Sequence, residues 1–176
     1  MRLALDISTS CTGWCVFDDN RKFIKMGYID LSKTKGFFNK CNLIKSSLED
    51  IFNSYKISIV YVEQNLQSFR PGLSSAQTLM TLAQFNGTVQ WICNDNWKVD
   101  VISINVNSAR KNVGLKVPRG TNTKEFVLNW VNEDLQGFDW PKKILKSGPN
   151  KGKERLINGC YDMADAYVIG KASFSV

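Results

Sequence analysis

The chain begins with three short runs in which apolar and polar residues alternate. In the first run Leu3, Leu5 and Ile7 alternate around Asp6, which predicts a buried strand with an acid inside it. Turn-forming residues at 18–20 separate the second run from the third, so an antiparallel start to a sheet is expected. The three predicted strands are residues 2–8, 13–17 and 23–29.

Further along the chain the apolar spacing becomes helical, and after that helical and strand-like segments alternate. Apolar residues recur every three or four positions from Phe37 to Tyr55, which is typical of a helix with one buried face. Thr121 or Thr123 can cap a later helix, and residues 137–153 are expected to be irregular because they contain two prolines and three glycines. The other predicted strands are 57–62 and 100–106, the other predicted helices are 74–93, 107–114, 121–134 and 158–172, and a loop is predicted over 64–73.

This order of elements predicts an α/β fold. Three strands followed by alternating helices and strands indicate a mixed five-stranded sheet with helices on both faces. The length of 176 residues fits one domain with its own core, so a single domain over residues 1–176 is expected.

The charge of the chain favours a polyanionic partner. Twenty-three Lys and Arg against 16 Asp and Glu give a net charge of +7, which suits nucleic acid or an anionic membrane surface. The alternative is a basic soluble protein with no such partner. The chain has no His, which excludes His-based catalytic triads, His general bases and the usual catalytic zinc sites.

The cysteines and the hydropathy indicate a cytoplasmic protein, bacterial or of a virus-infected cell. The first residues do not form a signal peptide, and no stretch approaches the roughly 20 apolar residues of a membrane span. The cysteine number is odd and the spacing irregular, so most of the thiols are expected to be small buried apolar side chains. The cysteines are Cys11, Cys15, Cys41, Cys93 and Cys160.

Four acids lie inside or at the ends of apolar elements, where acids are uncommon. Asp6 lies within the first predicted strand, Glu63 ends another, and Asp162 and Asp165 lie three positions apart in the last helix, on one face with Cβ atoms about 5–6 Å apart. Each has an ordinary structural explanation: a buried lysine partner, a strand end, a first-turn acid or a solvated helix face. All four explanations holding together is less favoured than one shared site.

The four acids together indicate a metal site. Four carboxylates without His make a hard site of oxygen ligands, which suits Mg²⁺, with Mn²⁺ as a substitute. In a basic protein this favours phosphoryl transfer, with two ions about 4 Å apart that activate a water and stabilise the leaving oxygen of a phosphodiester.

At these motifs the chain resembles the RuvC family of Holliday-junction resolvases, within the ribonuclease H-like superfamily. The opening segment 3–14 is similar to that family's first strand and turn, with its metal-binding Asp at Asp6. Residues 62–64, with Glu63, are similar to the second ligand segment, and residues 162–166 match the DxxDA motif of the last helix. The resemblance covers roughly residues 2–170 and implies a ribonuclease H-like fold.

The resemblance also implies DNA-contacting residues. Phe69, with Arg70 beside it, matches an aromatic that stacks at the junction centre, although a Phe covering the local core is equally compatible with its type. Basic residues near the cut phosphate match Lys111 and Lys124, with Arg110 close behind, and Lys124 is also assigned to catalysis; the alternative for all three is a solvated helix surface. Further phosphate contacts are expected from the basic segment around Lys142 and Lys143.

The activity implied by the resemblance is paired, symmetric nicking of a four-way junction or other branched DNA by a homodimer, leaving 5′-phosphate and 3′-hydroxyl ends. The chain departs from the family before the last acid pair, where residues 159–161 lack the His that members often carry. The long basic segment 137–153 suggests a divergent, phage- or virus-encoded member.

Three other functions remain open from the sequence. Another ribonuclease H-like nuclease, acting on RNA–DNA hybrids or as an exonuclease, would keep the same acids. A non-catalytic DNA-binding module would keep the fold alone. An actin-like ATPase is less favoured, because such enzymes need two domains and a second glycine-rich nucleotide motif.

Overall fold

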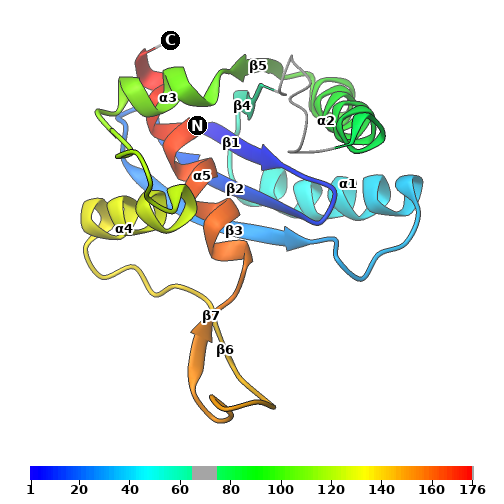
Figure 1. Cartoon of the computed structure of the whole chain (residues 1–176). Helices are drawn as coiled ribbons and strands as arrows, with labels where there is room; N and C mark the ends of the chain where they lie inside the picture. The colour runs from blue at the N-terminus through cyan, green and yellow to red at the C-terminus, as the bar shows by residue number, and fades with distance from the viewer. Residues whose placement is uncertain (65–74, 176) are drawn as a thin grey trace.

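The computed structural model describes residues 1–64 and 75–175. A mixed five-stranded sheet in the order β3-β2-β1-β4-β5 forms its centre (Figure 1). β1 pairs antiparallel with β2 and β2 antiparallel with β3, whereas β1, β4 and β5 run parallel to one another. The strands are β1 Arg2–Ile7, β2 Cys11–Phe17, β3 Phe23–Asp30, β4 Ile59–Glu63 and β5 Asp100–Ile104.

Helices cover both faces of this sheet, as the sequence predicts (Figure 1). On one face α1 (Phe37–Ser54) and α2 (Ala76–Trp97) enclose a core with Leu3 and Leu5 of β1. On the other face α3 (Val106–Asn112), α4 (Thr123–Leu135) and α5 (Gly159–Ala172) enclose a second core with Ala4 of β1. Successive residues of a strand point to opposite faces, so β1 contributes to both cores.

Helix α5 lies very close to the strands because glycines remove the side chains between them. A Cβ atom on Gly13 of β2 would lie 1.9 Å from the carbonyl oxygen of Asp162 in α5. A Cβ on Gly170 would lie 2.6 Å from the ring of Phe17, and one on Gly159 would lie 2.7 Å from the ring of Tyr28. The sequence therefore permits this helix to bring its acids down to the sheet.

The structure corrects the predicted elements in three places. Helix α2 continues to Trp97, four residues past its predicted end, through polar residues that carry no apolar period. Helix α4 is capped by Asn122, whose side chain accepts hydrogen bonds from the backbone of Lys124 and Glu125, and not by Thr121 or Thr123.

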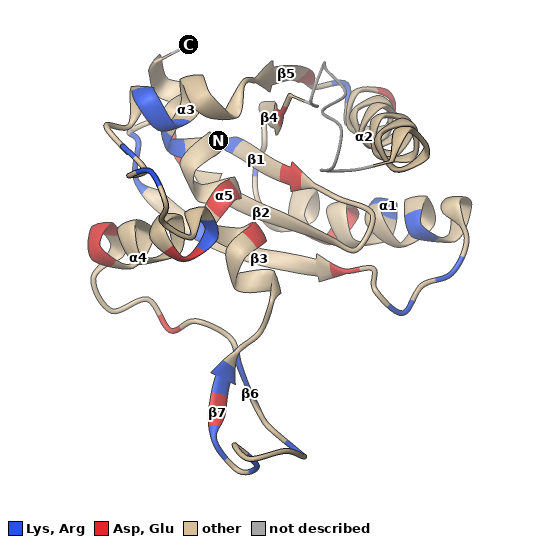
Figure 2. Cartoon of the chain, in the orientation of Figure 1, with Lys and Arg blue, Asp and Glu red and all other residues tan. Residues whose placement is uncertain are grey.

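The third correction is that the segment predicted to be irregular contains a hairpin. Strands β6 (Lys142–Ile144) and β7 (Glu154–Leu156) pair antiparallel in a sheet of their own, which projects away from the rest of the molecule (Figures 1 and 2). With three residues each, and with charged side chains on both faces, these strands lack the alternation that identifies a strand in a sequence.

Two smaller expectations concern the cysteines and the membrane. Four of the five cysteines are buried as predicted, and Cys11 is partly exposed. Among the residues that the structure describes, no helix combines the length and apolar character needed to span a bilayer. The single domain over residues 1–176 stays a prediction.

Candidate active site

Two of the acids lie at the ends of neighbouring parallel strands. β1 and β4 are in register with Leu5 opposite Val62, so Asp6 and Glu63 follow directly on adjacent strands. Both residues are partly buried. Because the carboxyl ends of parallel strands lie at the same edge of a sheet, acids far apart in the sequence come together here.

Helix α5 brings the other two acids to the same place. Asp162 lies in its first turn and Asp165 follows three residues later, on the same helix face. All four carboxylates, together with Lys124, line one cavity of about 380 Å³. The structure thus brings the four predicted acids together, while their roles stay a prediction.

Burial raises the pKa of each of these carboxyl groups, and repulsion from neighbouring acids adds to this effect at Asp6, Glu63 and Asp165. The pKa of Asp6 is raised well above its ordinary value, by burial first and then by the negative charges of Glu63 and of the two acids on α5. Burial also raises the pKa of Glu63, although a hydrogen bond from the Asp6 carboxyl acts in the opposite direction. The pKa values of Asp162 and Asp165 are raised by burial as well.

This cavity has the donor chemistry of a site for a divalent cation. Carboxylate oxygens are the ligands that Mg²⁺ and Mn²⁺ prefer. Among the described residues no three Asp, Glu, Cys or His side chains are placed as a ready-made metal cage. Burial and crowding instead raise the pKa values of these carboxyl groups, and a divalent cation would relieve the repulsion between their negative charges. The residues therefore fit such an ion in chemical type.

Lys124 provides positive charge at the rim of the acid cavity. It is the second residue of α4, it is exposed, and its charge lowers the pKa of each of the four acids against the effect of burial. The Asn122 side chain accepts a hydrogen bond from the Lys124 backbone at 3.2 Å, which fixes the start of the helix and so the position of the lysine.

Arg110 forms an ion pair inside the site. Its Nη2 lies 3.3 Å from Oδ1 of Asp165, and the two side chains are only 21% and 16% exposed. Positive charge on Arg110 lowers the pKa of Asp165 against the raising effect of burial. Its Nε is buried and has no hydrogen-bond partner in the part of the chain that the structure describes. Arg110 thus contacts an acid of the site, whereas the sequence favoured a DNA phosphate as its partner.

Two residues of the site were missed by the sequence reasoning. Asn86 is buried on α2, lines the acid cavity and donates a hydrogen bond from Nδ2 to the backbone oxygen of Glu63 at 3.3 Å. The thiol of Cys11 hydrogen-bonds to Asp162, and its own pKa is raised by burial and then by that acid. Asn86 was detectable as an amide at a buried position of a helix, but Cys11 carried no signal of its own.

The other predicted DNA-binding residues lie away from the acids or outside the described chain. Lys111 is exposed on α3 and lines a different cavity, which it shares with Arg110. Lys142 and Lys143 are exposed on the projecting hairpin. Phe69 and Arg70 lie outside the described residues.

Solved structures with a similar fold exist, although no protein-family model and no curated protein matches the chain. The RuvC of T. thermophilus in complex with a Holliday junction substrate is similar over 97% of this chain and 90% of that chain, with a TM-score of 0.66 at 13% sequence identity. A second Thermus thermophilus RuvC structure is similar over 97% and 91%, with a TM-score of 0.60 at 15% identity.

A third similar structure is the yeast mitochondrial Holliday junction resolvase Ydc2. It matches over 97% of this chain and 76% of that chain, with a TM-score of 0.53 at 12% identity. At these identities the likeness shows the fold: this chain has the ribonuclease H-like fold that the sequence predicts.

Proposed function

We propose that this chain, which has the fold of the RuvC resolvases, is a metal-dependent endonuclease that cuts four-way junctions by paired nicks. The observation that carries the proposal is the convergence of Asp6, Glu63, Asp162 and Asp165 in one cavity, where the pKa values of all four are raised. Such a group of acids weakens the fold unless it binds cations. The products would carry 5′-phosphate and 3′-hydroxyl ends.

The four acids would hold two Mg²⁺ or Mn²⁺ ions. When bound, such ions lower the pKa of a water and stabilise the charge on the leaving oxygen. Lys124, exposed beside the acids, would bind a non-bridging oxygen of the cut phosphate. Arg110 would hold Asp165 in place through their ion pair. Asn86 would fix the strand end at Glu63 through its hydrogen bond to that backbone.

DNA as the substrate is supported by the charge of the chain and by the likeness to a resolvase in complex with its junction. Lys111 and Lys143 are exposed lysines that would contact phosphates, whereas Lys142 is paired with Glu154. Phe69 and Arg70, in the segment after Glu63, would act at the junction centre.

A product map tests this function against the alternatives. The chain is incubated with Mg²⁺ or Mn²⁺ and labelled four-way junctions, flaps, Y-forks, plain duplex and RNA–DNA hybrid. We expect symmetric nicks in the junction and little cutting of duplex. Preferred cutting of hybrid would instead support another ribonuclease H-like nuclease, and binding without cutting would support a DNA-binding module.

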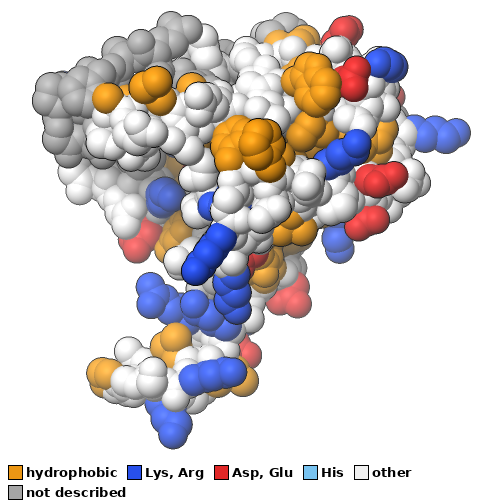
Figure 3. All heavy atoms as spheres, turned by 90° about the vertical axis from the view of Figure 1, so that its right-hand side faces the viewer, with side chains coloured by type: hydrophobic (Ala, Val, Ile, Leu, Met, Phe, Trp, Pro, Cys, Tyr) orange, Lys and Arg blue, Asp and Glu red, His pale blue; other side chains and the backbone are white. Residues whose placement is uncertain are grey.

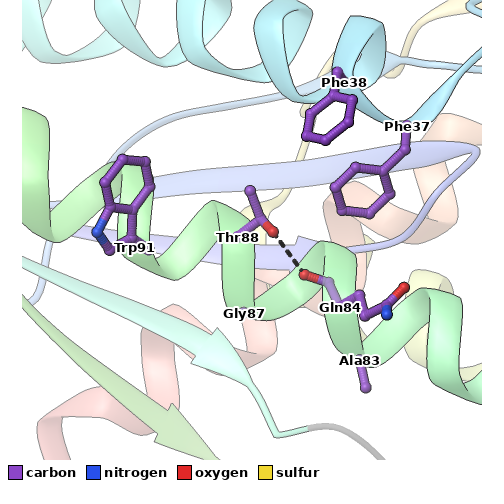
Figure 4. Close-up of a pocket in the computed structure, with 7 residues that line it drawn as sticks. All are labelled: Phe37, Phe38, Ala83, Gln84, Gly87, Thr88 and Trp91. Atoms are coloured by element: carbon purple, nitrogen blue, oxygen red, sulfur yellow. Dashed lines mark hydrogen bonds between the residues drawn. The ribbon is translucent and has the colours of Figure 1, made fainter.

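Paired nicks require two active sites, so the proposal includes a homodimer. A four-way junction has near two-fold symmetry, which a dimer with two-fold symmetry can match. An apolar groove between α1 and α2 is the surface that we assign to the second copy. It is lined by Phe37 and Phe38 of α1 and by one side of α2 from Ala83 to Trp91 (Figure 4). Figure 3 shows exposed hydrophobic side chains on this side of the molecule.

The charge and the shape of this groove suit binding to the same groove of a second copy of the chain. Helix α2 carries no charged residue from Ala76 to Asn94, so two molecules of charge +7 can approach here without placing like charges together. Gly87 leaves open space, because a Cβ placed on it would have no described atom within 4 Å apart from its chain neighbours and the backbone of its own helix. Ala83 and Trp91 lie four residues to either side. Two antiparallel α2 helices crossing at Gly87 would therefore place each Trp91, 62% exposed, against the small Ala83 of the partner.

Trp91→Glu is predicted to separate the two copies. Loss of a central Trp anchor typically weakens an interface by about 2–4 kcal/mol, which corresponds to a dissociation constant higher by roughly 30- to 1,000-fold. Sedimentation velocity over a range of concentrations measures this change. Ile144→Glu places the same charge on an exposed apolar residue outside the groove and should leave the dimer intact. Equal behaviour of the two variants, or a wild-type chain that stays monomeric, would exclude this interface.

A further inference from the structure

The hairpin of β6 and β7 carries much of the positive charge of the molecule. Between residues 142 and 155 six of the 23 Lys and Arg are found, with Glu154 as the one acid. The hairpin projects from the body of the molecule, and its basic residues are visible along it (Figures 2 and 3). Charge of one sign is therefore concentrated on an element that is accessible from several directions.

The two faces of the hairpin differ in charge. On one face Lys142 forms an ion pair with Glu154, with Nζ and Oε2 3.3 Å apart. On the other face Lys143 lies directly opposite Arg155, and Lys153 follows at the next position along that face, where its backbone oxygen bonds to Leu145. None of these three cations forms an ion pair with any residue in the described ranges 1–64 and 75–175. We call them the cationic face.

This arrangement is unfavourable in the isolated protein. Like charges directly opposite one another destabilise a pair of strands, and the hairpin has little apolar burial to offset that effect because its strands are exposed. Glu154 neutralises Lys142 on the opposite face, and no acid neutralises the three cations of the cationic face among the described residues. A bound polyanion would supply the missing countercharge on the cationic face.

The base of the hairpin is fixed to the helices that carry the active site. Trp140 is buried and donates from Nε1 to Oδ1 of Asn132 on α4 at 3.1 Å. The carbonyl oxygen of Pro141 accepts hydrogen bonds from the Ile157 backbone at 3.2 Å and from the Cys160 thiol at 3.3 Å. Strand β7 ends at Leu156, six residues before Asp162. A duplex held by the hairpin is thereby held in a set position relative to the acids.

We propose that the hairpin is a second DNA-binding element, whose cationic face of Lys143, Lys153 and Arg155 binds the phosphates of one duplex arm. A two-stranded ribbon is of a size that the major groove of B-form DNA admits. The inference rests on the proposed function for the identity of the arm, since a junction offers a duplex next to the cut site. The hairpin positions that arm, and the acid cavity receives the strand to be cut.

The test compares two triple variants that remove the same charge. The first, K143A/K153A/R155A, removes the cationic face. The second, K33A/K45A/K56A, removes three exposed lysines located before, on and after α1, on the other side of the sheet. Binding to a four-way junction and to plain duplex is measured by fluorescence anisotropy in Ca²⁺ over a range of salt concentrations. Circular dichroism confirms that both variants fold.

The first variant should bind both DNAs at least about 10-fold more weakly. The negative slope of log K against log salt should become shallower by about 2–3, because each phosphate contact contributes about 0.9 to its magnitude. The second variant should keep nearly the wild-type slope. Lys142→Ala, on the neutralised face, should have less effect than Lys143→Ala. Shortening one junction arm should weaken wild-type binding but not binding by the first variant.

Several outcomes would overturn the inference. Equal losses in the two triple variants would show that the hairpin contributes only net positive charge and no specific binding. Tighter hairpin-dependent binding of duplex RNA than of duplex DNA would contradict a ribbon in the major groove, since the major groove of RNA is too narrow. If the first variant binds and cuts junctions like the wild type, the inference fails and the proposed nuclease stands. If duplex binding depends on the hairpin but the wild type cuts nothing with Mg²⁺, the nuclease fails and the hairpin stands.

Discussion

Asp6→Asn should abolish junction cleavage while leaving junction binding nearly intact. Asp6 is central among the four acids, and Asn cannot supply the negative charge that a divalent cation needs. We expect cleavage with Mg²⁺ to fall by about 10³-fold or more, a change of roughly 4 kcal/mol in activation free energy. Single-turnover cleavage and anisotropy in Ca²⁺ measure the two properties separately. Asp50→Asn, an exposed acid on α1, is the matched control.

The same substitution should stabilise the protein in EDTA, and the sign follows from the raised pKa. The folded state holds the Asp6 proton more tightly than the unfolded state does, so the free energy of unfolding falls as the pH rises above about 4 toward the raised pKa. Asn removes this loss. Urea unfolding should therefore show the variant more stable than the wild type at pH 7, with no such gain at pH 4. Full nuclease activity in the variant, or a lower stability at pH 7, would refute the assigned site.

Gly13→Ala should severely destabilise the fold and disrupt the site. The new methyl group would lie 1.9 Å from the carbonyl oxygen of Asp162, so α5 would have to move away from the sheet and take two acids with it. We expect a loss of about 3–4 kcal/mol, the range of severe packing defects. For a chain of this size that lowers Tm by roughly 10 °C, which differential scanning calorimetry measures.

Gly159→Ala is the matched control. It adds the same methyl group at the contact between α5 and the sheet, but from the first residue of α5 and not from β2. Its methyl group would meet Cγ of Tyr28 at 2.7 Å, which belongs to the side chain of an exposed residue and not to the backbone that Gly13 would meet. The loss should be clearly smaller than for Gly13→Ala. Similar losses at the two positions would show that backbone contact is not the critical feature at Gly13.

The sequence predicted most of the fold because apolar periodicity is strong in the long elements. Leu3, Leu5 and Ile7 identify β1, and the three- to four-residue spacing from Phe37 identifies α1. The hairpin strands are short, charged and exposed, so they carry no such pattern. Likewise α2 extends beyond its apolar positions because its backbone hydrogen bonds continue through polar residues.

In the site, local relations were predictable and long-range ones were not. The spacing of Asp162 and Asp165 fixes them on one helix face, and the structure has them there. The ion pair of Arg110 with Asp165 joins residues from two different helices, and the spacing within either helix gives no sign of it. The hydrogen bond from Asn86 to Glu63 likewise joins a helix to a strand end far away in the sequence, so no local spacing predicts it.

The contact of Gly13 with α5 also limits how far such sequences can diverge. In the pairing of β1 with β2, Asp6 lies directly opposite Gly13. The register of the two strands therefore fixes the position of the first acid relative to the glycine that α5 contacts. The solved structures that share this fold are only 12–15% identical to the chain in sequence. Distant homologues should therefore be recognisable by a joint pattern: an acid in the first strand, a glycine seven residues later, and two acids three positions apart in the last helix.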